Sequence, residues 1–129
     1  MAARLLIPKR SDVWFADFGH VETGDDGTER YIRYREQGGK RPCVILSKND
    51  FNGGWSELVV VAPITSVDKR YSTHVRIEPP EGGLQIPSFV IREGIRSIAR
   101  QFLVRRTGMV EDRTMREIML QLNDFLLFS

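Results

Sequence analysis

The run LVVVAPIT at residues 58–65 carries the strongest strand signal of the chain. It is rich in β-branched residues, which fit the pleated surface of a sheet. Pro63 has no N–H to donate to a strand ladder, so we expect a sheet edge, a strand end or a bulge at this position. The run RPCVILS at residues 41–47 predicts a second, almost continuously apolar strand, and the turn formers NDFNGG at residues 49–54 lie between the two.

Four further segments predict short strands. Residues 11–18, SDVWFADF, place apolar or aromatic side chains on both faces, as in a strand that is packed on two sides. Shorter strands are expected at residues 73–77 and 105–110, and a strand at residues 88–98 is expected to bend near Gly94. Residues 19–40 are rich in turn formers. They predict a long loop between the first two strands, in which residues 31–34 have the pattern of a short hairpin.

The C-terminal segment changes to a helical period. It predicts an amphipathic helix over residues 112–127, with an apolar stripe of Met115, Ile118, Met119, Leu122, Phe125 and Leu126. Several short strands with frequent turns, followed by one helix, indicate a mainly β (α+β) protein. We expect a single domain over residues 1–129, built as a small, strongly bent antiparallel sheet or barrel that the helix closes on one side.

Composition excludes several classes of protein. Hydrophobic residues make up 41% and charged residues 28% of the 129 residues, which is ordinary for one globular domain. The longest apolar run is far shorter than the roughly 20 residues of a membrane span, and residues 1–9 lack the apolar core of a signal peptide, so we expect a cytoplasmic protein. The single cysteine, Cys43, excludes an intrachain disulfide and predicts a buried thiol. We expect no metal and no cofactor.

The charge distribution leaves two interpretations open. The net charge is +2, which is too small to indicate nucleic-acid binding by itself. Residues 92–106, however, hold five arginines and a single acid, Glu93. This segment is either a solvated charged face or a stripe that binds phosphates.

Two strand ends bring candidate catalytic residues together. The segment EQGGKRP at residues 36–42 leads into one buried strand, and APITS at residues 62–66 ends the next. Pro42 restricts the backbone of Arg41, whose forked guanidinium suits a phosphate, and Thr65 offers a hydroxyl. The alternative is that Arg41 forms a salt bridge at the rim of the sheet and that Thr65 caps a turn.

At this point the sequence resembles a known family, the MazF/PemK toxins of bacterial toxin–antitoxin pairs, over about residues 9–126. Each matching motif is short, but their order and spacing are specific. Gly94 and Ala99 stand where the family has Gln and Asp. The matching segments are RSDVW at 10–14, EQG at 36–38, RP at 41–42, LSKND at 46–50, VAPITS at 61–66, THV at 73–75, PS at 87–88 and IRSI at 95–98.

The resemblance implies an SH3-like barrel, a homodimer and a toxin that inhibits translation and growth. It implies a metal-independent, sequence-selective endoribonuclease that cleaves single-stranded RNA to 2′,3′-cyclic phosphate and 5′-hydroxyl ends, and a cognate antitoxin with an acidic disordered tail. Catalytic roles fall on Arg41, Thr65 and Glu36. Roles in RNA binding fall on Gln37, Ser66, Glu93, Arg96, Phe15, Asn49 and Lys69.

Several assignments stay open at this stage. A guanidinium, with a pKa of about 12.5–13.8, is a poor base, so charge stabilisation is the firmest role for Arg41, and Glu36 or Glu93 is a candidate base. We expect His74 to be a packing residue. The segment 19–40 is interpreted as a lid or as an insertion without a role. The competing functions are a non-catalytic small-barrel toxin that acts on a protein target and a general single-strand binder.

Overall fold

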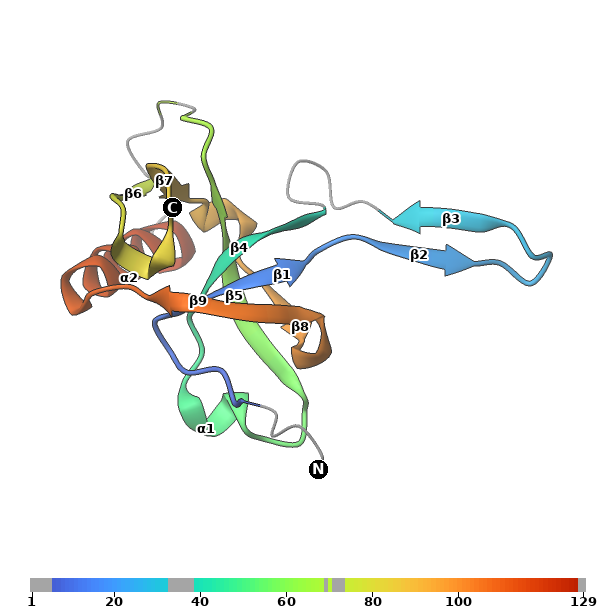
Figure 1. The fold of residues 1–129 in the computed structure, drawn as a ribbon. Helices are drawn as coiled ribbons and strands as arrows, with labels where there is room; N and C mark the ends of the chain where they lie inside the picture. The colour runs from blue at the N-terminus through green and yellow to red at the C-terminus, as the bar shows by residue number, and fades with distance from the viewer. Residues whose placement is uncertain (1–5, 33–38, 69, 71–73, 128–129) are drawn as a thin grey trace.

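The computed structural model describes residues 6–32, 39–68, 70 and 74–127, which form one curled antiparallel sheet, a projecting hairpin and a C-terminal helix (Figure 1). Six strands follow one another across the sheet in the order β6-β7-β5-β4-β1-β9, and β8 pairs with β5. The sheet curls into a half-barrel, which confirms the predicted mainly β fold. Its strands are β1 (Asp12–Asp17), β4 (Lys40–Ile45), β5 (Leu58–Thr65), β6 (Val75–Ile77), β7 (Ser88–Val90), β8 (Arg96–Ala99) and β9 (Leu103–Met109).

Pro63 explains why β5 has two different partners along one edge. β7 pairs with Ile64 and Thr65, whereas β8 pairs with residues 58–61. Between these ladders the Pro63 carbonyl accepts a hydrogen bond of 2.8 Å from the Ile91 N–H. The nitrogen of Pro63 faces the same edge and has no hydrogen to donate, so the partner strand is interrupted there. The strand expected at residues 88–98 is therefore two strands separated by the 3-10 turn η3 (Arg92–Gly94).

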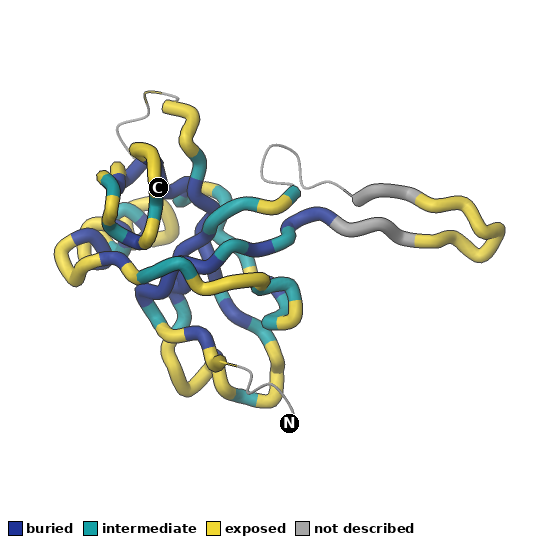
Figure 2. Tube along the Cα trace, viewed as in Figure 1, coloured by how far each residue is buried: buried dark blue, intermediate teal, exposed yellow. Residues whose placement is uncertain are grey.

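The two faces of the sheet carry separate hydrophobic clusters, and the buried residues gather in the body of the molecule (Figure 2). The first cluster contains Val44 and Ala62 and packs against the C-terminal helix. The second contains Cys43 and Val61, together with side chains of β1 and β8. Successive residues of β4 and β5 thus enter different clusters, which accounts for the continuous apolar runs in these strands. Each cluster residue of these strands is buried.

The helix α2 (Asp112–Leu127) covers the first cluster over the range in which the sequence predicts a helix. Met115, Ile118 and Leu122 are buried against the sheet. The predicted stripe is wrong at its end, because Phe125 and Leu126 are 42% and 60% exposed. Phe125 instead contacts the Arg92 guanidinium, whose carbon lies 5.1 Å from the centre of the ring.

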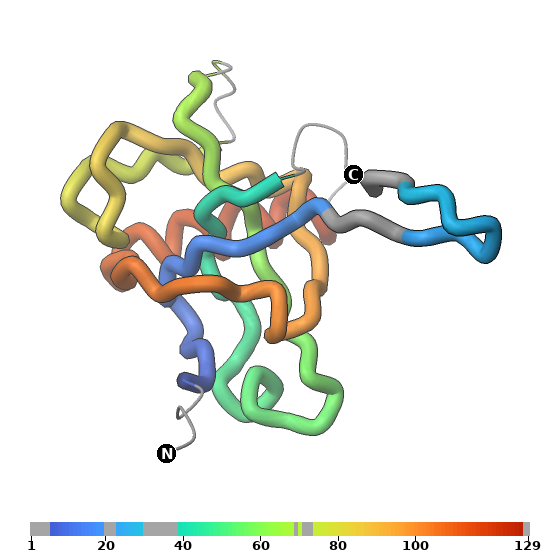
Figure 3. Tube along the Cα trace, turned by 45° about the vertical axis from the view of Figure 1, so that its right-hand side comes forward, coloured from blue at the N-terminus to red at the C-terminus, as the bar shows by residue number. Residues whose placement is uncertain are grey.

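The segment predicted as a long loop contains a β-hairpin that projects from the body (Figure 3). Strand β2 (His20–Thr23) pairs with β3 (Glu29–Ile32), and the Gly24 N–H donates to the Thr28 carbonyl at 2.7 Å to close the turn. Gly27 has φ +82°, a conformation that glycine adopts without strain. The turn formers in the sequence therefore mark a hairpin tip, while residues 33–38, including part of the expected short hairpin, lie outside the described residues.

Three short helical segments complete the fold. The helix α1 (Asn49–Asn52) occupies the predicted turn between β4 and β5, and the 3-10 turn η4 (Arg100–Phe102) joins β8 to β9. The 3-10 turn η2 (Glu81–Gly83) packs against β9. Within the described ranges, no helix has the length and apolar character of a membrane span.

The buried thiol of Cys43 gives a direct test of this packing. Burial raises the pKa of Cys43 to about 12, so the reactive thiolate is scarce at neutral pH. We expect a thiol-specific reagent such as Ellman's reagent to label the native protein extremely slowly and the urea-unfolded protein at once. Fast labelling of the folded protein would contradict the burial of Cys43 in the second cluster.

Candidate functional site

Arg41, at the start of β4, and Thr65, at the end of β5, lie at the same end of the ladder between these strands. The ladder between these strands pairs Val44 with Ala62 and Cys43 with Pro63. Arg41 and Thr65 each lie two residues beyond the Cys43–Pro63 pair, so by strand alternation both side chains extend from the face that carries Cys43 and Pro63. That face carries the second hydrophobic cluster, so both side chains lie at its rim, where they are half-buried.

The hydroxyl of Thr65 is oriented by the turn that follows it. Its oxygen accepts a hydrogen bond of 3.1 Å from the Val67 N–H. A hydroxyl that accepts one bond still has its own hydrogen to donate. Thr65 therefore caps the turn, in agreement with one of the two interpretations of the sequence. Its hydroxyl hydrogen can still be donated to a ligand beside Arg41.

A second guanidinium lies on the same face of the sheet. Arg96 pairs with Val61 across β8 and β5, which directs its side chain toward the second cluster. Its guanidinium carbon lies 5.5 Å from the centre of the Phe18 ring. Such a cation–π contact restrains the position of an arginine side chain. Phe18 follows Ala16 on one face of β1, and Ala16 is itself opposite Arg41.

A carboxylate is fixed close to the end of β5 by a buried histidine. His74 Nε2 lies 2.7 Å from Glu93 Oε1, with the His74 side chain 2% exposed and the Glu93 side chain 42% exposed. Glu93 belongs to η3, which starts directly after Ile91. The Ile91 N–H donates to the carbonyl of Pro63 near the end of β5. His74 is thus buried, as the sequence predicts, and in addition it restrains an accessible carboxylate.

The structure places two of the predicted RNA-binding residues away from Arg41 and Thr65, one on the other face of the sheet and one beyond the far end of β4. Phe15 pairs with Pro42 and lies on the other face of β1 from Ala16. Asn49 is at the start of α1, beyond the far end of β4, and its Oδ1 accepts a hydrogen bond of 2.9 Å from the Arg10 N–H.

The remaining predicted site residues fall into two groups. Ser66 follows Thr65 directly at the end of β5 and is exposed. The other predicted residues are outside the described part of the chain: Glu36, Gln37 and Lys69.

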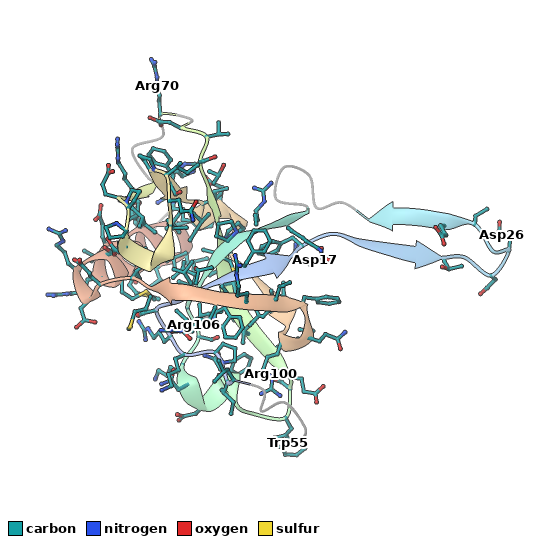
Figure 4. The ribbon with its side chains drawn as sticks, in the orientation of Figure 1. Asp17, Asp26, Trp55, Arg70, Arg100 and Arg106 are labelled. Atoms are coloured by element: carbon teal, nitrogen blue, oxygen red, sulfur yellow. The ribbon has the colours of Figure 1, made fainter. Side chains whose placement is uncertain are left out.

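The arginine-rich segment 92–106 does not form one stripe. Arg92 Nη1 donates to the Gln121 carbonyl at 3.1 Å and so anchors the end of α2. Arg100 Nη1 donates to the Asn52 carbonyl at 2.7 Å, and Arg106 Nε donates to Asp12 Oδ1 at 3.0 Å. Figure 4 shows Arg100 and Arg106 toward the end of the body that carries α1. The interpretation of a continuous phosphate-binding surface is therefore wrong, because three of the arginines bind different parts of the fold.

Comparison with known proteins places this arrangement in a family. Residues 9–126 match the family described as the PemK-like, MazF-like toxins of type II toxin–antitoxin systems. The chain belongs to this family. The resemblance noted from the sequence is thereby confirmed, and the match includes both strand ends of the site.

Characterised relatives of this MazF-like chain align over most of its length. It is 32% identical to Endoribonuclease EndoA of Bacillus subtilis over 115 residues, which cover 88% of this chain and 89% of the relative. It is 33% identical to Endoribonuclease MazF of Staphylococcus saprophyticus over 112 residues, which cover 85% of this chain and 83% of the relative.

Solved structures of MazF-like toxins share the fold. The crystal structure of MazF from Deinococcus radiodurans superposes with a TM-score of 0.73 at 24% identity, over 94% of this chain and 97% of that one. An endoribonuclease in complex with its cognate antitoxin, from a mycobacterial species, superposes with a TM-score of 0.68 at 22% identity, over 95% of each chain. These likenesses support the curled sheet with its C-terminal helix.

Sequence reasoning missed two features of this MazF-like site. The sequence indicates Phe18 only as part of an apolar strand, and nothing local indicates that it contacts an arginine 78 positions later. The bond between His74 and Glu93 spans 19 positions. The only sequence signal for the contact between Phe18 and Arg96 is the strand alternation that places Ala16 and Phe18 on one face.

Proposed function

We propose that this chain is the toxin of a toxin–antitoxin pair and acts as an endoribonuclease on single-stranded RNA at the Arg41–Thr65 site. The ladder between β4 and β5 is the observation that carries the proposal, because the strand ends just beyond its last pair hold Arg41 and Thr65 on one face of the sheet. Two relatives that are more than 30% identical are named as endoribonucleases. Cleavage of messenger RNA in the cytoplasm would stop translation and growth.

The proposed chemistry is an internal phosphoryl transfer. The ribose 2′-oxygen attacks the adjacent phosphorus, and the bond from phosphorus to the 5′-oxygen breaks. The 2′-hydroxyl gives its proton to a base, and the leaving oxygen takes one, so the products are a 2′,3′-cyclic phosphate and a 5′-hydroxyl. The reaction consumes no water and needs only proton transfer and stabilisation of a crowded, doubly charged phosphorane.

The side chains present fit these tasks. The guanidinium of Arg41 stabilises the charge on the phosphorane oxygens, and Arg96 adds positive charge from the same face. The Thr65 hydroxyl donates to a non-bridging oxygen while Val67 N–H holds it in place. Glu93, held by His74, and Glu36 are the two candidate bases. Each role can be filled without a metal ion, so we propose metal-independent cleavage.

We propose in addition that the toxin works as a homodimer and is neutralised by an antitoxin with an acidic tail. A toxin-like fold of this kind has been solved as an endoribonuclease bound to its cognate antitoxin. An acidic tail and RNA are both polyanions, so the arginines at the site would attract either one.

Incubation of the purified protein with single-stranded RNA in EDTA tests the function. We expect cleavage with cyclic-phosphate ends, and no cleavage of duplex RNA or DNA, because attack needs a free 2′-hydroxyl that can align with the phosphorus. Product ends are identified by mass spectrometry. Intact RNA in both EDTA and Mg²⁺ would contradict the proposal and favour a protein target, whereas cleavage only with Mg²⁺ would contradict the metal-independent mechanism.

A further inference from the structure

A large groove lies at the opposite end of β5 from Thr65. It has a volume of about 680 Å³ and includes Glu57, which directly precedes the strand, whereas Thr65 is the last residue of the strand. Consecutive residues of β9 border it, although successive side chains of a strand point to opposite faces. The groove therefore follows the edge of β9, and we call it the β9 groove. It is lined by residues 6–8, Trp14, Glu57, residues 99–101 and residues 103–106.

The edge of β9 along this groove is open to a further strand. The sheet ends with β9, which pairs with β1 on its other side. Within residues 6–32, 39–68, 70 and 74–127, β1 is the only strand that pairs with β9. An unpaired edge presents a row of N–H and C=O groups, to which an extended peptide can add by backbone hydrogen bonds. The groove thus offers a backbone binding surface as well as side chains.

The groove contains an apolar surface that reaches the solvent. Trp14 is 7% exposed, and its indole N–H donates to Asp12 Oδ2 at 3.3 Å, so the polar atom of the ring already has a partner. Leu6, Ile7 and Val104, in contrast, are 68%, 52% and 57% exposed. Exposed apolar side chains that gather in one groove are typical of a surface that binds a partner.

Positive charge borders this apolar surface. Arg100, Arg105 and Arg106 line the groove together with the single acid Glu57, and Figure 4 shows Arg100 and Arg106 at this end of the body. Arg106 is bonded to the buried Asp12, and with both acids counted the three arginines still leave an excess of positive charge. Arg105 is exposed, and within the described part of the chain it forms no ion pair. Charge complementarity therefore favours an acidic partner.

Two other occupants fit the β9 groove less well. A second copy of this chain that added edge to edge would bring the arginines of two β9 strands together, and like charges opposite each other in a sheet are destabilising. RNA would satisfy the arginines, but unpaired bases bind by stacking on aromatic rings and guanidinium planes, whereas the exposed apolar side chains of the groove are aliphatic. An acidic protein segment with apolar side chains matches both the charge and the apolar surface.

We propose that the β9 groove anchors an extended, acidic segment of the antitoxin. The segment adds to the edge of β9 as a strand, its carboxylates face Arg100 and Arg105, and its apolar side chains cover Val104 and residues 6–8. This inference rests on the proposed function, in which an antitoxin with an acidic tail is the partner. The antitoxin thereby gains affinity from a surface that is separate from Arg41 and Thr65.

Isothermal titration of the protein with the antitoxin encoded beside its gene tests this docking surface. Val104→Glu and Arg105→Glu each place a carboxylate in the groove, so we expect each to raise Kd about tenfold or more through repulsion and loss of a contact. Both side chains are exposed, so the fold should be kept, which circular dichroism checks. Arg113→Glu is the matched control. It makes the same charge change on α2, where the side chain is 84% exposed, and should alter Kd by less than about twofold.

Hydrogen exchange locates the bound antitoxin independently of the variants. The amides of residues 103–106 that face the groove should exchange more slowly in the complex, because an added strand accepts hydrogen bonds from them. Slower exchange that is confined to other segments would overturn the added strand.

RNA cleavage measured without antitoxin keeps the docking surface apart from the ribonuclease activity. Unchanged affinity in both groove variants removes the docking surface and leaves the ribonuclease standing. A parallel loss of cleavage would assign the groove to RNA, and a change of oligomeric state in size-exclusion chromatography would assign it to a second copy. A wild-type protein that cleaves RNA but does not bind the antitoxin would contradict the proposed partner and this inference together.

Discussion

Replacement of Arg41 by alanine is expected to lower the rate of RNA cleavage by about 10²–10³-fold, the effect of removing one preorganised donor from a transition-state oxyanion. Arg41 is half-buried and lies two residues beyond the last recorded pair of the ladder between β4 and β5. The loss should appear in kcat, because the charge on phosphorus develops in the transition state. Single-turnover cleavage of a fluorescent oligonucleotide measures it.

Two variants make the interpretation of Arg41→Ala specific. Arg113→Ala removes the same charge from the exposed start of α2, where the side chain is 84% exposed, and should leave the rate within about twofold of wild type. Arg41→Lys keeps the charge without the fork, so we expect intermediate activity. Circular dichroism and thermal unfolding confirm that the variants fold. A folded Arg41→Ala protein with full activity would remove Arg41 from the catalytic site.

Replacement of Gly83 by alanine is expected to cause the largest loss of stability. A Cβ built on Gly83 lies 2.1 Å from the backbone oxygen of Thr107, and φ is +73°. Because the obstacle is backbone rather than a movable side chain, η2 would have to separate from β9. We expect a loss of more than about 4 kcal/mol in the free energy of unfolding, at the exceptional end for single substitutions. Urea unfolding followed by tryptophan fluorescence measures it.

The variant Gly27→Ala separates the cost of the steric clash at Gly83 from the cost of a left-handed backbone conformation, which both glycines share. Gly27 has φ +82° at the hairpin tip, but a Cβ there has no atom within 4 Å. We expect Gly27→Ala to lower the free energy of unfolding by only about 1–2 kcal/mol, which is the penalty of the left-handed region for an L-residue. Equal losses of unfolding free energy for Gly27→Ala and Gly83→Ala would mean that the close approach of η2 to β9 does not contribute to the destabilisation by Gly83→Ala.

The elements of this fold are predictable from sequence where the information is local. The apolar runs of β4 and β5 and the helical stripe up to Leu122 depend on neighbouring side chains, and both are confirmed. Pro63 could be recognised as a break in the ladder, because its missing N–H does not depend on context. The hairpin β2–β3 was missed because its glycines mark turns without showing which residues pair across them.

The candidate site is only partly predictable for a related reason. Arg41 and Thr65 each end a strong strand, so an antiparallel pairing of the two strands suffices to bring them together. The contact of Arg96 with Phe18 depends on how far the sheet curls, which no local pattern encodes. The same holds for the arginines of segment 92–106, which look alike in the sequence but bind α2, α1 and Asp12. The catalytic and RNA-binding roles remain predictions.

The projecting hairpin has a consequence for how the molecule can be handled. Its tip, residues 23–29, is exposed and stands clear of both hydrophobic clusters (Figure 3). Exposed loop tips of this kind accept inserted sequence with little effect on the packed body. An epitope or a fluorophore-carrying cysteine inserted between Asp25 and Asp26 would therefore label the protein without entering its core. For the same reason, we expect homologues to tolerate different chain lengths at this point.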